Sequence, residues 1–145
     1  MCTSFKGELL TGTHNFGTGV VRASTAADTF KAALYLASAT IDASTTAYTA
    51  TGEVSGTNYS SGGVTVTFGT APSTSGTTAF VTPSASITYS AVTLSTAFDC
   101  VLIYNSSQSN KAVSVHTFGS QTVTAGTFTL TMPTNDASTG LIRLA

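Results

Sequence analysis

Charge is the scarcest property of this sequence, because only 8% of its 145 residues are charged and the formal net charge is −1 at pH 7. Its few basic residues are scattered and form no stripe that would neutralise a run of phosphates. They are Lys6, Arg22, Lys31, Lys111 and Arg143. The sequence therefore argues against nucleic acid, and against an anionic membrane surface, as partners. Long apolar runs are missing too, since no stretch approaches the ~20 apolar residues of a membrane span.

Cysteine is almost absent, and the two present are Cys2 and Cys100. Two are too few for a disulfide framework, so we expect free thiols. Cys100 is expected to be a small core residue at the start of a strand, and Cys2 to lie on a mobile end. Residues 1–8 lack the basic and apolar regions of a signal peptide, so we expect synthesis in a cytoplasm. The glycosylation sequons at Asn58 and Asn105 are accordingly interpreted as turn residues.

Serine and threonine are abundant, with 49 among 145 residues, and 41% of the chain is hydrophobic. Disordered segments combine low hydrophobicity with high net charge, so this composition predicts an ordered chain. The length fits one domain with a core of its own. We expect residues 21–145 to form that domain and residues 1–20 to be an N-terminal arm or a first strand.

Hydrophobic residues alternate with threonine along most of the chain. In residues 64–68, Val64, Val66 and Phe68 share one face and two threonines the other. The same alternation occurs in residues 87–89, 112–118 and 123–132, and threonine suits a strand because its branched Cβ fits the pleat. Turn signals recur roughly every 8 to 15 residues without a helix-length connection. This pattern predicts an all-β fold, an antiparallel β-sandwich of the jelly-roll or Ig-like kind with little or no helix.

Two segments are informative about the order of strands. Residues 101–104 and 112–118 are expected to form a central hairpin that is buried on both faces. Residues 24–37 are ambiguous: Phe30, Leu34 and their neighbours fit a helix capped by Ser24 or Thr25, but a period of two fits them equally well. Periodicity leaves both alternatives open.

Residues that would carry chemistry are few and unclustered. The chain has two histidines, His14 and His116, six carboxylates and no Gly-x-Ser-x-Gly nucleophile elbow. No His, Cys, Asp or Glu spacing matches a metal site, and no pair of acids suggests glycoside hydrolysis. We therefore expect no catalytic residue, no metal and no cofactor, and a protein that is not an enzyme.

A loop rich in glycine holds Tyr48, Asn58 and Tyr59, residue types that sugar-binding sandwiches use. The favoured interpretation is that the tyrosines close the sandwich and bond their hydroxyls locally. The alternative is a loop that contacts a carbohydrate. Gly62 and Gly63 indicate a turn with positive φ or, less favoured, the close approach of another chain.

Hydrophobic residues also occur in the glycine-rich N-terminal segment. They are too many for an arm that water surrounds, so they are candidates for contacts with other subunits or with the surface of a larger assembly, although a plain first strand explains them equally well. The candidates are Phe5, Leu9, Leu10, His14 and Phe16.

Four segments carry a resemblance to a known family. They are residues 29–35, residues 48–64, residues 102–107 with 111–113, and residues 118–119. Together they resemble a widespread family of small virion proteins of tailed bacteriophages, over nearly the whole length from Phe5 to Arg143. The resemblance implies that residues 30–36 are a strand, and we adopt that alternative.

The resemblance also implies a structural protein of the phage particle. We expect a capsid decoration or cement protein that binds the outside of the head and stabilises contacts between major capsid subunits, its site of action being the virion. Its partners would be the major capsid protein and copies of itself, a homotrimer suiting the threefold positions of an icosahedral shell. The alternative is a tail-associated module that binds a receptor or carbohydrate.

Overall fold

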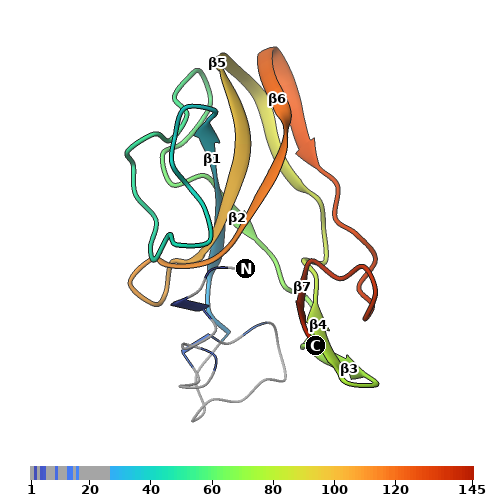
Figure 1. The fold of residues 1–145 in the computed structure, drawn as a ribbon. Helices are drawn as coiled ribbons and strands as arrows, with labels where there is room; N and C mark the ends of the chain where they lie inside the picture. Colours follow the sequence, from blue (N-terminus) through green and yellow to red (C-terminus); the bar gives the residue numbers. More distant parts are fainter. Residues whose placement is uncertain (1, 3, 6–8, 10–12, 15, 17–26) are drawn as a thin grey trace.

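The computed structural model describes residues 2, 4–5, 9, 13–14, 16 and 27–145. Within them the strands form two antiparallel sheets, one in the order β2-β1-β5-β6 and a smaller one in the order β3-β4-β7 (Figure 1). The strands are β1 (Phe30–Leu36), β2 (Val64–Val66), β3 (Ser73–Ser75), β4 (Thr78–Val81), β5 (Ile87–Asn105), β6 (Lys111–Leu130) and β7 (Ile142–Leu144). The predicted all-β antiparallel sandwich is confirmed.

Strand β1 resolves the ambiguous segment in favour of a strand. It lies between β2 and β5, with Ala32 opposite Val64 on one side and Ile103 on the other. Residues 32–35 are all buried, so both faces of this strand are covered. Small alanines and aromatic side chains let it lie at the centre of the sheet.

The long hairpin of β5 and β6 folds back on itself. Ala32 is the pairing partner of Ile103, yet it also accepts a hydrogen bond of 2.8 Å from the hydroxyl of Tyr89. Tyr89 and Ile103 belong to the same strand, and 14 residues of straight strand would separate them by about 46 Å. Since a tyrosine side chain spans only a fraction of that distance, β5 must bend.

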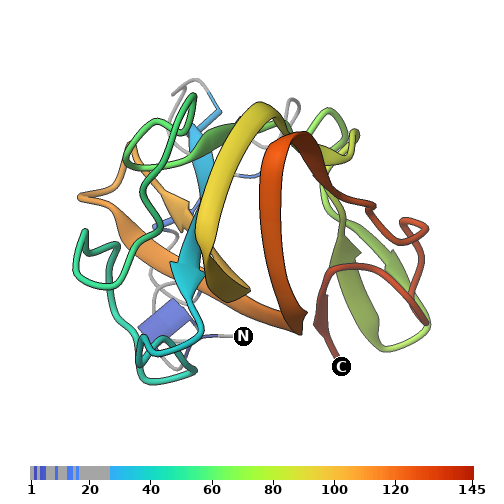
Figure 2. The same cartoon turned by 90° about the horizontal axis from the view of Figure 1, so that it is seen from above.

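Irregular pairing marks the bend. Register shifts interrupt the β5–β6 pairing between Tyr89 and Cys100, and Ala91 and Ala125 have positive φ angles of 52° and 45°. Extra residues of this kind kink a strand and increase its twist. Seen from above, the β5 and β6 ribbons arch across the centre of the molecule (Figure 2).

The bend gives the main sheet two layers. The first layer is β2, β1, residues 98–105 of β5 and residues 111–117 of β6; the second layer is residues 87–94 of β5 and 123–130 of β6. Aromatic rings fill the space between the layers: the ring centroids of Phe98 and Phe128 are 5.0 Å apart, and those of Tyr59 and Tyr89 are 5.9 Å apart. One hairpin thus supplies strands to both sides of the core.

The structure differs from the sequence prediction in two respects. The hairpin of residues 101–104 and 112–118 exists, but only β5 is central, because β6 is the last strand of its sheet. The short strands β3, β4 and β7 were not expected, since residues 72–76 resemble a turn. They form a small sheet at one end of the molecule (Figure 1).

Gly63 lies against the chain's own strand β1. Its φ is +71°, and a Cβ atom there would lie 1.7 Å from the carbonyl oxygen of Ala32. Its amide donates to the carbonyl of Ser60 over 2.9 Å, which closes a turn. The favoured turn interpretation is therefore confirmed, and the close approach is to β1.

This packing predicts that Gly63→Ala is far more damaging than Gly76→Ala. Gly76 also has a positive φ, +57°, but nothing lies within 4 Å of its would-be Cβ. We expect a loss of about 1 kcal/mol for Gly76→Ala from backbone strain alone, and about 3 kcal/mol or more for Gly63→Ala. Urea unfolding measures both, and equal losses would contradict the packing of Gly63 on β1.

Candidate functional site

Glu53 is the hydrogen-bonding centre of the tyrosine loop. Its Oε2 accepts from the hydroxyl of Tyr48 over 2.7 Å and from that of Ser61 over 2.9 Å. Its Oε1 accepts from the hydroxyl of Tyr59 over 2.9 Å and from the amide of Gly62 over 2.7 Å. A carboxylate offers about four lone-pair positions, so these donors occupy all of them. Glu53 therefore fixes the loop and has no position left for a ligand hydroxyl.

The other tyrosines also donate their hydroxyls inside the protein. Tyr35 donates to the carbonyl of Thr49 over 2.6 Å, and Tyr104 to that of Gly62 over 2.8 Å. Burial raises the pKa of Tyr104 to about 12, and it raises the pKa of Tyr59 further above its ordinary value. This is the arrangement expected of tyrosines that close the sandwich.

A shallow cavity of about 270 Å³ lies beside this loop. Three polar side chains that line it, Glu53, Tyr59 and Ser61, are already hydrogen-bonded to one another. Asn58 is exposed, has a φ of 60°, and donates from Nδ2 to the carbonyl of Ala91 over 2.9 Å. The loop residues proposed to contact sugar thus lie close together, but their polar groups serve the fold.

The N-terminal candidates pack into the core of their own chain. Phe16 stacks on Phe30 with ring centroids 4.6 Å apart, and contacts Phe68 edge-on at 4.9 Å. Phe5 lies edge-on to His14 at 4.8 Å. Phe5 is 0% exposed, Phe16 5% and His14 8%. Contact with a capsid through these three side chains stays a prediction, and it would require them to leave this cluster.

His14 is held by the turn that joins β5 and β6. Its Nδ1 lies 3.0 Å from Nδ2 of Asn105. Nδ2 also donates to Asp28 over 2.8 Å, and Oδ1 accepts from the amide of Ser107 over 3.1 Å, so the orientation of the Asn105 amide is fixed from both ends. Nδ1 of His14 therefore lies where it can accept a hydrogen bond from this amide. This contact joins the N-terminal segment to the hairpin.

Leu9 is half-buried and helps to line an apolar cavity of about 70 Å³. Phe5 and Phe16 line it from the same segment, and Phe80 and Ile142 from the small sheet. Phe5, Leu9 and Phe16 therefore lie next to the small sheet, and Phe16 also contacts Phe30 of the main sheet. Leu10 lies outside the described residues.

Cys2 is buried, contrary to the expectation of a mobile end. It is 0% exposed, and its amide donates to the carbonyl of Val113 over 3.1 Å. Cys100 is buried as expected, in the middle of β5 rather than at its start. Both cysteines are free thiols, as the sequence predicted.

His116 forms a hydrogen bond of 2.9 Å between its Nε2 and the hydroxyl of Ser114. Ser114 is 2% exposed, so a substrate has no access to its hydroxyl, and burial lowers the pKa of His116. Within the part of the chain that the structure describes, no three His, Cys, Asp or Glu residues gather as metal ligands would, and no helix has the length and hydropathy to cross a membrane.

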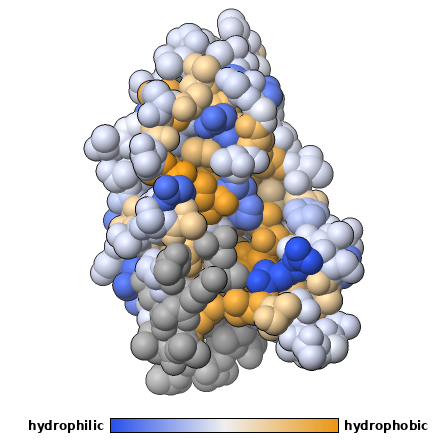
Figure 3. Space-filling model, in the orientation of Figure 1, coloured by the Kyte–Doolittle hydropathy of each residue, from blue (hydrophilic) through white to orange (hydrophobic). Residues whose placement is uncertain are grey.

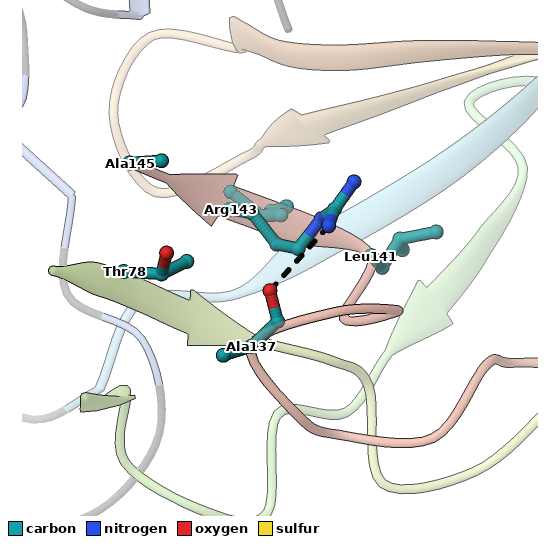
Figure 4. A pocket seen from close by; sticks show the side chains of 6 residues that line it. Thr78, Ala137, Leu141, Arg143 and Ala145 are labelled. Atoms are coloured by element: carbon teal, nitrogen blue, oxygen red, sulfur yellow. Dashed lines mark hydrogen bonds between the residues drawn. The ribbon is translucent and has the colours of Figure 1, made fainter. Parts of the chain in front are cut away.

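Arg143 lies at the rim of a depression of about 340 Å³ on the small sheet, together with Thr78, Leu141 and Ala145 (Figure 4). Its guanidinium donates to the carbonyl of Ala137 over 3.4 Å and also to that of Ser138. The arginine thus closes its own loop. Most of the surface in this orientation has intermediate hydropathy, and apolar atoms emerge at the centre and in a band beside the small sheet (Figure 3).

Comparison with known proteins gives no family. No protein-family model matches the chain, and no curated protein or solved structure is significantly similar to it.

Neutralising Glu53 is predicted to destabilise the fold. In Glu53→Gln an amide NH₂ replaces one acceptor oxygen and faces two donors, so we expect a loss of about 2 kcal/mol in the free energy of unfolding. Asp99→Asn is the matched control, because it removes one charge from a half-buried carboxylate on β5. Urea unfolding at pH 7 tests the pair, and equal losses would contradict the central role of Glu53.

Both thiols are predicted to be unreactive in the native protein. Burial raises the pKa of Cys100 to about 11, so at pH 8 about one thiol in a thousand is ionised, against about a quarter at an ordinary pKa. Labelling with a thiol-specific disulfide reagent should therefore be slow at pH 8 and complete in denaturant. Fast labelling of Cys2 alone would show that the N-terminal segment is not docked as described.

Proposed function

We propose that this chain is a structural protein of a tailed-phage virion, a capsid decoration or cement protein that binds the outside of the head. It would stabilise contacts between major capsid subunits by binding energy alone, without catalysis or a cofactor. Two kinds of evidence support the proposal. One is the resemblance in residues 29–35, 48–64, 102–107 with 111–113, and 118–119; the other is the absence of charge from the second layer.

The second layer is the observation that carries the proposal. Its two segments, 87–94 and 123–130, contain no Asp, Glu, Lys, Arg or His. Its exposed positions include five hydroxyl side chains: Thr88, Ser90, Thr124, Thr127 and Thr129. Burying a charge without a partner is costly, whereas hydroxyls find a hydrogen-bond partner readily. This layer therefore loses little hydration energy when another protein covers it.

Charged side chains of the described residues lie outside the second layer, and two of the carboxylates hold their own loops. Asp42 accepts from the amide and hydroxyl of Ser44, and Asp136 accepts from the amides of Ser138 and Thr139. These contacts lower the pKa of both carboxyls. These two carboxylates thus stabilise turns, and the second layer itself contains no charged residue.

Many equivalent copies of a modest contact would together stabilise the shell. A contact of about 1,000 Å² is enough for a specific interface, and a particle offers many equivalent sites. Partners in this proposal are the major capsid protein and copies of the chain itself, and its place is the virion. The homotrimer expected from shell symmetry belongs to the same proposal.

Copy number separates this role from a tail-associated one. Quantitative mass spectrometry of purified particles should find copies in the hundreds, in proportion to the major capsid protein. Around a dozen copies, or binding to host polysaccharide without binding to heads, would contradict the decoration role and favour the tail-associated module.

A charge on the second layer is predicted to weaken binding to heads. Thr124→Glu places a carboxylate on the neutral layer, whereas Thr74→Glu places one on the exposed strand β3. We expect Thr124→Glu to weaken co-sedimentation with heads at least about tenfold and Thr74→Glu to leave it unchanged. Unchanged binding of Thr124→Glu would show that heads contact another face.

A further inference from the structure

The outer edge of β6 is covered at one end only. There the loop before β2 pairs with it, since the amide of Ala112 donates to Thr46 over 3.0 Å and that of Tyr48 to Asn110 over 2.9 Å. Cys2 continues this cover at Val113. From Val115 to Leu130, none of the residues that the structure describes pairs with the outer edge. Most of a 20-residue strand thus presents backbone donors and acceptors to the outside.

This open edge lacks the usual side-chain protection. Exposed edges in soluble proteins carry lysine or other charges, or proline, which prevent pairing with another chain. Residues 115–130 contain none of Asp, Glu, Lys, Arg and Pro, and His116 is the one titratable group among them. The edge is therefore chemically free to add a strand.

One part of the edge has the regular geometry that strand addition needs. Extra residues interrupt the pairing of β6 between Thr117 and Gly126, and bulges of this kind hinder pairing with another chain. From Gly126 to Leu130, by contrast, β6 itself contains no extra residue; the register shift there places the extra residue on its inner neighbour β5, between Tyr89 and Val92. Five residues of strand span about 17 Å, a typical strand length.

The best match for this segment is the same segment of a second copy. The other edge strands of the described structure, β2, β3 and β7, have three residues each and are too short to pair along it. Two identical edges, however, match in length, and the net charge of −1 per chain gives little repulsion between them.

We propose that two copies of this chain pair antiparallel through residues 126–130 of β6, about a two-fold axis near Phe128. Thr127 of one copy then lies opposite Thr129 of the other, a cross-strand pair of threonines that is favourable in sheets. Phe128 keeps its place in its own core, against Tyr89 and Phe98. The contact joins the second layers of two molecules into one continuous sheet.

An isologous pair of this kind closes at two copies. It differs from the homotrimer expected from shell symmetry, and the mass in solution separates the two. It does not depend on the role in a virion, so binding to heads and pairing in solution can fail separately.

Sedimentation equilibrium of the purified full chain tests the proposal, with Thr129→Lys and Thr88→Lys as a matched pair. Thr88 is the cross-strand partner of Thr129, equally exposed on the same layer, but one strand away from the edge. We expect the wild type to form dimers. Thr129→Lys, which brings two like charges within about 8 Å across the axis, should raise the dimer dissociation constant about tenfold or more. Thr88→Lys should leave it within about twofold.

Three results would overturn the proposal. The first is a wild type that stays monomeric up to millimolar concentration, and the second is a trimer. The third is an equal rise of the dimer dissociation constant in Thr129→Lys and Thr88→Lys, which would indicate a contact through the face of the second layer. If Thr129→Lys fails to fold, hydrogen exchange of the wild type decides. Every second amide of residues 126–130, those that point to the open edge, should gain protection as concentration rises, and the amides of Ser73–Ser75 should not. Unchanged exchange of these outward-pointing amides would contradict the pairing.

Discussion

The fold depends on one hairpin that bends over its own base. Because β5 passes from the first layer into the second, the core is closed by the same two strands on both sides, and the layers cannot separate without breaking the bend. A hydrogen bond joins the two layers, because the hydroxyl of Tyr89 in the second layer donates to the carbonyl of Ala32 in the first. Phe98, at the bend, fills the space between them by contacting Phe118 and Phe128.

A chain with so few charges holds its loops by placing single polar groups inside them. Glu53 collects four donors from one loop, and Asn105, which is 0% exposed, joins the N-terminal segment to the turn of the hairpin. Each gives the buried polar atoms around it a hydrogen-bond partner, so that none of these atoms loses its partner on leaving water. The outer face of the second layer needs no such partner, because its hydroxyls face outward. Few charges are needed because single polar groups fix the loops. In the proposed role, the uncharged second layer is the surface that binds the capsid.

Sequence alone could predict the type of fold, because alternation and turn chemistry are local. Threonine opposite valine and phenylalanine in residues 64–68 identifies a strand whatever its neighbours are. The bend of β5 has no such local pattern. No feature of residues 90–97 predicts that Tyr89 contacts Ala32, and the residue with a positive φ there is Ala91 rather than a glycine. Residues 87–89 and 101–104 were therefore expected as separate strands.

Among the candidate residues, too, local features could be predicted and long-range contacts could not. Tyrosines that close a sandwich could be anticipated from their aromatic rings, but Glu53 was missed as their common acceptor. Its signal was available, since it is a lone carboxylate between Tyr48 and Tyr59 in a loop otherwise without charge. The burial of Phe5 and Phe16 depends on Phe30 and Phe68, which are distant in sequence. Long-range packing of this kind has no local pattern.

Cryo-electron microscopy of the intact phage particle tests the central claim most directly. The account predicts density for this sandwich on the outside of the head, with residues 87–94 and 123–130 turned toward neighbouring protein. Density confined to the tail, or a second layer that faces solvent on the head, would contradict it.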